Sequence, residues 1–395
     1  DTRSAARPKS AANSFPIIVH SHLGWDWVWQ RPQQFHSRLS KRHRILFVEG
    51  PVPRPEAKRA RVTLREVADY PNIVVLQMEM PQERWADMAW VDKERRRLVQ
   101  SVLAGPLGAG FENPVQWFYD PMAVTAFAGH LNESAVVYDC MDQLSQFRGA
   151  PAELVRRERE LLAIANVVFA GGPKIWKDKS RSNTNCYSFG CGVDVKHFAR
   201  ATDPATSMAK DIADLPRPIY GYIGVVDERI DYDLLGALAQ QNARGSVVMI
   251  GPWTKVDPAT FPQRSNLHWL GGRDYGQLPA YAKTFDVCLM PFALNEATEF
   301  INPTKALEYM ATARPIVSTA IEDVVLQFSE VVKVARTRAE FITFCEQAAA
   351  RPNRAAIQRG LKLAADNSWD SIVRKLEAHV LDVVATERSI ATDAA

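Results

Sequence analysis

The chain has 395 residues, of which 47% are hydrophobic, 24% charged and 9% aromatic, and this ordinary globular composition excludes wholesale disorder and fibrous repeats. Its length exceeds that of one ordinary core, so we expect two domains with a cleft between them. Apolar runs fall short of the ~20 residues that cross a bilayer, and five scattered cysteines without a CxxC pair argue against disulfides or a zinc site. We therefore expect a cytoplasmic protein with buried free thiols.

The net charge of +3 is unevenly spread along the chain. Residues 1–200 carry 28 Lys/Arg against 21 Asp/Glu, and the remainder carries 20 against 24. The basic excess gathers at residues 41–44, 54–65 and 95–97. Such runs attract anionic lipid or acidic glycan, although most are simply solvated surface. The first half is therefore where we expect any peripheral contact with the inner membrane, and we expect no nucleic-acid partner.

After a polar stretch over residues 1–13, expected to be a disordered tail, short apolar runs alternate with amphipathic stretches. This alternation predicts parallel α/β architecture. Strands are predicted in the first half at Phe15–His20, Ile45–Val48, Ile73–Met78, Val115–Tyr119, Ala135–Tyr138, Val167–Ala170 and Cys186–Phe189. Helices are predicted over Arg31–Ser40, Trp85–Leu103 and Ala152–Ala165.

The proline-punctuated stretch Ala199–Pro218 predicts a linker. Strands are predicted beyond it at Ile219–Ile223, Ser246–Ile250, Leu267–Leu270, Val287–Met290, Pro315–Ser318 and Val331–Val334, with helices over Asp233–Gln240, Leu278–Phe285, Thr304–Ala313 and Ser368–Val384. The predicted fold class is α/β, with two Rossmann-like domains facing a central cleft. The first spans residues 14–200 and the second 218–367, joined by a linker over 201–217. Residues 368–395 form a crossover helix and tail expected to return to the first domain.

The segment Phe300–Met310 reads FINPTKALEYM and follows a predicted strand. Asn302 is a good N-cap, and Pro303 suits the first turn of a helix. Free amides there and the charge of Lys305 favour an anion, while Glu308, one turn on, can reach a ribose diol. Taken alone, these residues fit a nucleotide-diphosphate site and an ordinary capped helix about equally well.

This segment resembles the donor-binding motif of the large bacterial "group 1" glycosyltransferases, with its Pro-x-Lys-x-x-Glu-Tyr helix. The run from His22 to Gln34, HLGWDWVWQRPQQ, resembles the first strand-to-helix loop of a bacterial subgroup associated with exopolysaccharide and teichuronic-acid assembly. The resemblance covers nearly the whole chain and implies a GT-B fold, with the acceptor held mainly by the N-terminal domain and the donor by the C-terminal domain. It also implies a nucleotide-diphosphate sugar as co-substrate, with no cofactor and no metal ion.

The chain departs from the pattern of retaining relatives at two places. Those relatives commonly carry a second Glu eight positions before the helix Glu, where this chain has Phe300, and Glu299 is one residue out of register. Tyr119-Asp120-Pro121 stands where many of them carry a His. Both departures favour an inverting mechanism.

The predicted acceptor site begins in the Trp-rich loop, where Gly24 permits close approach of a ligand. The tryptophans of this loop offer faces for stacking on sugar rings, unless they bury a domain edge. Arg31 either meets a phosphate or caps its own helix. The predicted acceptor-binding residues are His22, Gly24, Trp25, Asp26, Trp27, Arg31 and Tyr119.

An inverting transferase needs a carboxylate that takes the proton of the acceptor hydroxyl. We favour Asp142 because it lies far out on the loop after a buried strand, whereas Asp139 is expected to brace that turn. Asp26 is expected to orient the acceptor or the loop. The predicted catalytic residues are Asp142, Asp26, Arg229 and Lys305.

Glycine turns follow the predicted strands of the second domain. Gly224 ends a turn that resembles the family's phosphate-binding turn, where Arg229 would neutralise the leaving diphosphate. Backbone groups near Gly272 and Arg273 would read the nucleotide base, and Tyr275 either stacks on the base or packs. The predicted donor-binding residues are Gly224, Arg229, Gly272, Arg273, Tyr275, Asn302, Pro303, Thr304, Lys305 and Glu308.

Together these features predict a glycosyltransferase of the hexosyltransferase type that moves a sugar from a UDP-sugar to a glycan or lipid-linked acceptor in cell-surface polysaccharide synthesis, by inversion. Three alternatives stay open: a retaining transferase of the same fold, a GT-B-fold nucleotide-sugar epimerase, and a non-catalytic glycan-binding subunit.

Overall fold

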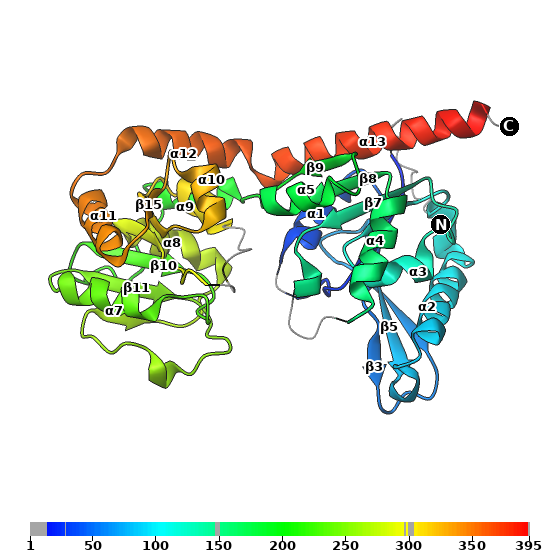
Figure 1. Ribbon diagram of the computed structural model, residues 1–395, viewed down its shortest axis with the longest axis horizontal. Helices are drawn as coiled ribbons and strands as arrows, with labels where there is room; N and C mark the ends of the chain where they lie inside the picture. The colour runs from blue at the N-terminus through cyan, green and yellow to red at the C-terminus, as the bar shows by residue number, and fades with distance from the viewer. Residues whose placement is uncertain (1–13, 28, 147–150, 296–297, 299–303, 394–395) are drawn as a thin grey trace, which may run out of the picture. The chain divides into compact units, whose positions relative to one another are not determined.

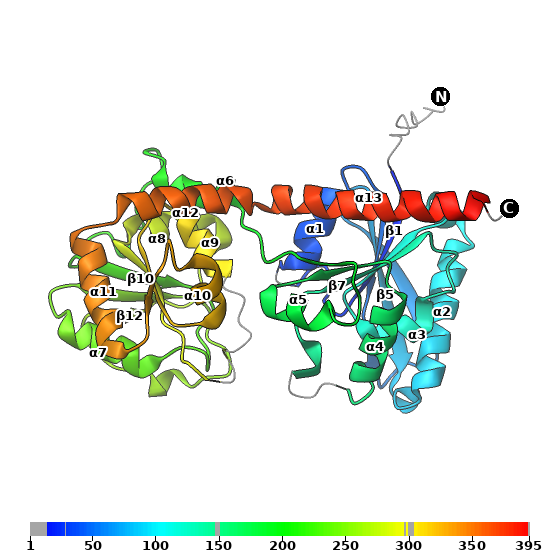
Figure 2. The same cartoon turned by 45° about the horizontal axis from the view of Figure 1, so that its top comes forward.

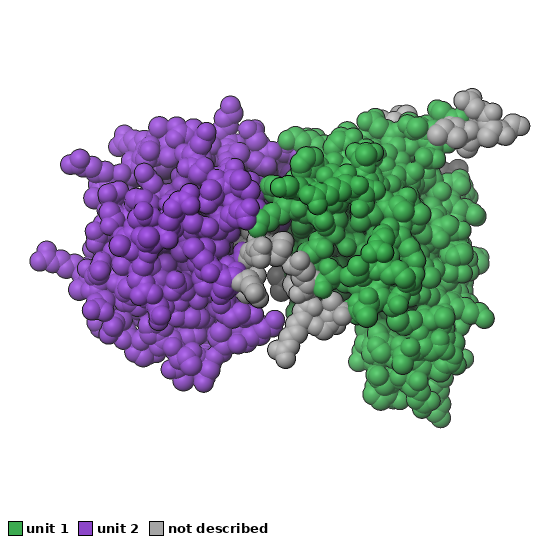
Figure 3. All heavy atoms as spheres, viewed as in Figure 1, with its two compact units in different colours: residues 1–190, 373–395 green, residues 191–372 purple. Residues whose placement is uncertain are grey.

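The computed structural model describes residues 14–27, 29–146, 151–295, 298 and 304–393. The chain divides into two compact units, which are coloured separately in Figure 3. Unit 1 comprises Asp1–Gly190 and Val373–Ala395, and unit 2 comprises Cys191–Ile372. Each unit is a sheet of mainly parallel strands flanked by helices (Figure 1).

Unit 1 has the strand order β3-β5-β2-β1-β6-β7-β8-β9, with β4 paired antiparallel to β5 and the other strand pairs parallel. The strands are β1 (Ile17–Ser21), β2 (Ile45–Glu49), β3 (Val52–Arg54), β4 (Arg61–Glu66), β5 (Ile73–Pro81), β6 (Val115–Phe118), β7 (Ala135–Cys140), β8 (Val167–Ala170) and β9 (Cys186–Ser188). Its helices are α1 (Arg31–Leu39), α2 (Met88–Leu103), α3 (Val124–Phe127), α4 (Leu154–Ile164) and α5 (Pro173–Lys179). Every residue of β1, β6, β7 and β8 is buried, as expected of central parallel strands.

Unit 2 has the strand order β12-β11-β10-β13-β14-β15, and its strand pairs are parallel. The strands are β10 (Ile219–Ile223), β11 (Ser246–Ile250), β12 (Leu267–Trp269), β13 (Val287–Met290), β14 (Ile316–Thr319) and β15 (Lys333–Ala335). The helices are α6 (Val195–Phe198), α7 (Tyr232–Gln241), α8 (Leu278–Thr284), α9 (Thr304–Ala311), α10 (Glu322–Phe328), α11 (Arg338–Ala350) and α12 (Arg354–Asp366).

The strand order reverses at one place in each sheet. In unit 1, β1 lies between β2 and β6, and in unit 2, β10 lies between β11 and β13. Ligands of open α/β sheets bind at such switch points, beyond the carboxyl ends of the strands. The sheet topology therefore directs attention to the loops after β1 and β6 in unit 1, and after β10 and β13 in unit 2.

The last helix, α13 (Trp369–Asp393), begins in unit 2 and continues in unit 1 (Figure 2). Within unit 1, Glu377 Oε1 lies 2.6 Å from His43 Nε2, and the ring of His379 stacks on Tyr187 with centroids 3.7 Å apart. Asn166 Nδ2 donates to Glu387 Oε1 at 2.9 Å. These contacts confirm the prediction that the C-terminal helix returns to the first domain. Across the described ranges, no helix is both long and apolar enough to span a membrane.

The predicted domain boundary needs correction, because the stretch predicted as a linker belongs to unit 2. It begins with a 3-10 turn over Ala199–Thr202, directly after α6. Ala201, Ala209 and Ile212 are buried in the apolar core of unit 2, and the chain passes between the units at Gly190 instead. A stretch of small residues and prolines can pack against α8 or form a solvated linker. Composition alone therefore does not distinguish the two.

Candidate functional site

The carboxyl edge of the unit 2 sheet is built from glycine turns that pack on one another. Gly224 and Gly251 follow β10 and β11, with φ angles of +157° and +154° that favour glycine. The amide of Gly224 donates to Ile250 O at 2.8 Å, and that of Gly251 donates to Gly271 O at 2.9 Å. A Cβ on Gly251 would lie 1.7 Å from Gly224 O. Because these glycines have no side chains, the turns after β10, β11 and β12 can pack in close contact.

Lys305, on the first turn of α9, reaches directly over the β10 turn. A Cβ on Gly224 would lie 2.1 Å from Lys305 Cε and 2.3 Å from its Nζ, so the lysine uses the space that the glycine leaves open. The ammonium also lies 5.6 Å from the ring centroid of Tyr222. Burial lowers the pKa of Lys305, while the negative charge of Glu308 opposes this effect. The structure thus brings together Lys305 and Gly224, two residues that are far apart in the sequence.

Arg229 lies in the loop after β10 and adds a second cation to this edge. Its Nη2 lies 2.6 Å from Asp227 Oδ2, and this hydrogen-bonded carboxylate raises the pKa of Arg229. The carbonyl of Arg229 accepts from the amide of Ala293 at 2.8 Å, which ties the loop after β10 to the loop after β13. Arg229 is close enough for its charge to help lower the pKa of Lys305. Two cationic side chains therefore lie at the switch point of unit 2.

Glu308 and Tyr309 lie one turn further along α9. Glu308 is half-buried. Burial raises the pKa of its carboxyl, and the positive charge of Lys305 opposes this rise. The hydroxyl of Tyr309 accepts from the amide of Ile223 at 2.8 Å and so fastens α9 to the end of β10. Tyr309 belongs to the motif, but this role is not predictable from the sequence, because a hydrogen bond to a distant strand leaves no local pattern. Asn302 and Pro303, with Glu299 and Phe300, lie outside the described residues.

At the switch point of unit 1, the loops after β1, β6 and β7 carry His22, Asp120 and Asp142. These three strands are neighbours in the order β1-β6-β7. Burial raises the pKa of Asp142 to about 6, although the charge of Arg31 opposes it. A carboxylate with this pKa is suited to accept a proton near neutral pH.

Arg31 and Tyr119, both predicted to bind the acceptor, lie beneath these loops instead. Arg31 is 3% exposed, and its Nε lies 2.8 Å from Asp139 Oδ1. Its Nη1 donates to Phe189 O at 2.5 Å and to Gly190 O at 3.1 Å. Tyr119 is 1% exposed. These two residues brace the site from inside, as was predicted for Asp139.

The Trp-rich loop divides into a buried anchor and an exposed part. Trp25 is 3% exposed and packs edge-on against Phe47 and Tyr70, so it buries the domain edge. Trp27 is 66% exposed and remains free to meet a ligand. Asp26 is exposed and paired with Arg65 at 2.5 Å. The carbonyl of Gly24 accepts from Gln33 Nε2 at 2.9 Å, so this glycine serves to hold the loop onto α1.

Comparison with known proteins supplies the fold. No protein-family model matches the chain. A Bacillus subtilis protein named as the teichuronic acid biosynthesis glycosyltransferase TuaH is 20% identical over 327 residues, which cover 77% of this chain and 80% of that protein. Sucrose-phosphate synthase from Thermosynechococcus elongatus superposes with a TM-score of 0.65 at 16% identity, over 94% of this chain and 100% of that chain. The chain has the GT-B fold. Anabaena HepE, solved with UDP and glucose, also superposes, with a TM-score of 0.64 at 9% identity over 93% of this chain and 99% of that chain.

Within this GT-B fold, the residues predicted to read the nucleotide base lie in the loop after β12. Arg273 donates from Nε to the hydroxyl of Tyr281 and from Nη1 to Leu270 O, both at 2.6 Å, and its Nη2 lies 3.0 Å from Asp211. Its guanidinium therefore braces unit 2, whereas the predicted base contact is through backbone groups near Gly272 and Arg273 and stays a prediction. Tyr275 stacks on His197 with centroids 3.9 Å apart and is 51% exposed, and Gly272 is exposed, so a base contact at either residue stays a prediction.

The basic runs of unit 1 present less free charge than the sequence suggests. The arginines at 54 and 61 both pair with Glu79 on β5, and Arg42 pairs with Glu377. Arg97 pairs with Glu94 on α2. Because these arginines pair with carboxylates, the positive field that would draw unit 1 to an anionic membrane is reduced.

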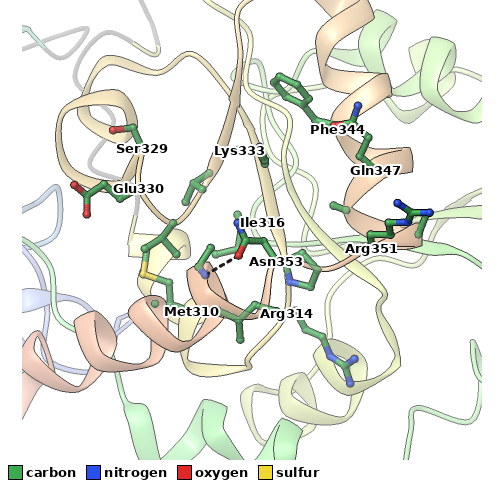
Figure 4. A pocket seen from close by; sticks show the side chains of 18 residues that line it. Met310, Arg314, Ile316, Ser329, Glu330, Lys333, Phe344, Gln347, Arg351 and Asn353 are labelled. Atoms are coloured by element: carbon green, nitrogen blue, oxygen red, sulfur yellow. Dashed lines mark hydrogen bonds between the residues drawn. The ribbon is translucent and has the colours of Figure 1, made fainter.

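A separate cavity of about 600 Å³ lies in unit 2, shown in Figure 4. It is lined by Arg314 and Ile316 at the start of β14, by Lys333 at the start of β15, and by side chains of α11 and α12. The amino ends of the strands border it, whereas the glycine turns and Lys305 lie at the carboxyl ends. This cavity is therefore distinct from the candidate site. Among the described side chains, no three His, Cys, Asp or Glu gather in a way that would hold a metal ion.

Proposed function

We propose that this chain is a glycosyltransferase that moves a sugar from a UDP-sugar to a hydroxyl of a glycan or lipid-linked acceptor in cell-surface polysaccharide synthesis. The observation that carries the proposal is the placement of Lys305 over Gly224, beside Arg229, at the switch point of unit 2. The names of the similar proteins support it, since TuaH is named for teichuronic acid biosynthesis and HepE was solved with UDP and glucose.

In this proposal unit 2 binds the donor. The bond between the anomeric carbon and the diphosphate breaks during transfer, and negative charge develops on the leaving diphosphate oxygen. Lys305 and Arg229 are cations held ready for that charge, so they stabilise the transition state without having to reorganise. Glu308 would accept hydrogen bonds from the ribose hydroxyls. With two cations on the protein, the proposed chemistry requires no chelated metal.

Unit 1 supplies the base in this proposal. The acceptor oxygen attacks the anomeric carbon from the face opposite the diphosphate, and its proton passes to Asp142 in the same step. One displacement of this kind inverts the configuration at the anomeric carbon. The rise in the pKa of Asp142 to about 6 supports the role, because the carboxylate is ionised at neutral pH yet basic enough to share a proton. Phe300, at the position of the second Glu of retaining relatives, also supports inversion.

The proposal is tested first by donor binding. Calorimetry with UDP and with GDP should show UDP binding to the wild type, and Lys305→Ala should weaken it at least tenfold. Lys362→Ala, which removes an exposed lysine of α12, is the matched control and should leave it unchanged. If neither UDP nor GDP binds, the proposal is contradicted.

The stereochemistry and the reaction class need a second experiment. NMR of the product made from an α-linked UDP-sugar should show a β-linkage, and an α-linkage would take the base role from Asp142. Incubation with UDP-sugars and no acceptor should produce no epimer, and epimer formation would identify the nucleotide-sugar epimerase instead.

A further inference from the structure

We propose that the cavity of unit 2 bordered by β14, β15, α11 and α12 binds an organic phosphate, a molecule that carries a phosphate group on an apolar body. The volume of about 600 Å³ falls within the range of about 300–1,000 Å³ that is usual for ligand pockets. The cavity lies at the amino ends of the strands, away from Lys305, so this second site does not depend on the proposed transfer reaction.

Much of the cavity lining is apolar and closely packed. A Cβ on Gly360 of α12 would lie 2.9 Å from Val331 Cγ1 and 3.1 Å from Met310 Cγ, so this helix lies tightly against both residues. Met310 belongs to α9 and is 2% exposed. Ile316 at the start of β14 and Phe344 on α11 extend the apolar lining. A hydrocarbon or aromatic body is favoured on such a surface, because both lose contact with water when it binds.

Three cationic side chains line the same cavity, from three different elements (Figure 4). They are Arg314, Lys333 and Arg351, and the carboxylate of Glu330 is the single negative charge in the lining. Arg314 is fixed by its Nη2, which donates to Lys283 O at 2.6 Å. Its Nε is buried and has no hydrogen-bond partner among the described residues. The lining therefore carries a net charge of +2, since three positive charges face one negative charge.

This charge matches a phosphate better than a carboxylate. The ammonium of Lys333 lies 5.6 Å from the ring centroid of Phe344, which holds it at the wall of the cavity. In the part of the chain that the structure describes, no carboxylate pairs with Lys333 or Arg351. A phosphate monoester carries a charge of about −1.5 to −2 near neutral pH, and guanidinium groups bind its oxygens in pairs. A monocarboxylate would leave half of the positive charge uncompensated.

The start of α12 also borders the cavity, but it is not the source of this preference. Asn353 Oδ1 accepts from the amide of Ala356 at 3.1 Å, which is the dashed bond in Figure 4. The carbonyl of Asn353 accepts from the amide of Ile357 at 3.0 Å. The helix therefore supplies its own cap, and the affinity for an anion comes from the three cationic side chains.

The ligand class is tested by calorimetry of the whole chain with 1-naphthyl phosphate, which should bind with a Kd below about 1 mM. Inorganic phosphate and 1-naphthol each lack one half of the probe and should bind at least tenfold more weakly, as should 1-naphthoate with its single charge. Equal binding of 1-naphthoate would overturn the choice of a phosphate. Saturating UDP should leave the Kd of the probe within twofold, and displacement of the probe by UDP would place it at the donor site and overturn the proposal.

The position of the site is tested by variants and by NMR. The double variant Lys333→Gln, Arg351→Gln changes two exposed side chains and should raise the Kd of 1-naphthyl phosphate at least tenfold. Arg244→Gln removes an exposed arginine of unit 2 outside the cavity and should leave the Kd unchanged. In protein labelled at the methionine methyl groups, the probe should shift the signal of Met310 and leave that of the exposed Met208 in place. Unchanged affinity in the folded double variant, or an unshifted Met310 signal, would overturn the proposal.

Discussion

Replacement of Gly224 by alanine is the sharpest perturbation of the candidate donor site. The new Cβ would lie 2.1 Å from Lys305 Cε and 2.6 Å from the hydroxyl of Tyr222, where ordinary contacts begin at 3.4 Å. Lys305 must therefore withdraw by about 1 Å or more, because packed interiors leave little slack. The backbone at φ +157° adds strain to any L side chain.

The expected loss of affinity follows from the displaced charge. A hydrogen bond from a charged group contributes about 1.5–3 kcal/mol, so moving the Lys305 ammonium away from a diphosphate should weaken UDP binding about 10- to 150-fold. Strain at position 224 should cost a further ~1–3 kcal/mol of folding free energy. The two effects are separable, because one is measured by binding and the other by unfolding.

Calorimetric titration with UDP and urea unfolding of the same samples measure both effects. Gly276→Ala is the matched control, since a Cβ there meets no atom within 4 Å. In a Lys305→Ala background, Gly224→Ala should weaken binding little further, because both changes act through the same ammonium. Gly224→Ala protein that binds UDP within twofold of the wild type would refute the placement of Lys305 at the diphosphate.

Three further predictions concern other parts of the molecule. If Asp142 is the base, kcat falls as the pH drops through about 6, and Asp142→Asn lowers kcat by about 10²-fold or more with UDP affinity unchanged. Tyr309→Phe leaves the buried amide of Ile223 without its acceptor, which should lower the urea-unfolding free energy by about 1–3 kcal/mol. His20 and His36 are buried with pKa values lowered to about 3, so the unfolded chain binds more protons below pH 6.5. Each should therefore cost about 2 kcal/mol of stability at pH 5 relative to pH 7.5, and equal urea midpoints at the two pH values would contradict this.

The sequence predicted the central strands well because central parallel strands are apolar along their whole length. The predicted bounds of β8, β10, β11 and β13 coincide with the observed ones. The edge strands β3 and β4 were missed, since half-exposed residues such as those of Arg61–Glu66 do not form an apolar run. Their arginines form a basic run in the sequence, whereas in the structure several of them pair with carboxylates on neighbouring strands and loops.

The candidate site was predictable only where its chemistry is local. Helix-start chemistry predicts Lys305 and Glu308, and loop position predicts Asp142. The contact of Lys305 with Gly224 joins segments about 80 residues apart, so no pattern within one segment could show it. The buried pairing of Arg31 was missed for the same reason, because its partner Asp139 lies far away in the sequence. A charged residue at a strand end can therefore be assigned to a ligand only when its distant partners are known.

Helix α13 makes unit 1 discontinuous, and this governs how the protein can be assembled and divided. The partner of His43 on this helix, Glu377, leaves the ribosome only after all of unit 2 has been synthesised. Unit 1 can therefore complete its packing only after unit 2 has been synthesised, while the segment Cys191–Ile372 is continuous. A fragment cut at Gly190 lacks this helix. A circular permutant in which Val373–Ala395 precedes β1 would instead contain all of unit 1 in one uninterrupted stretch.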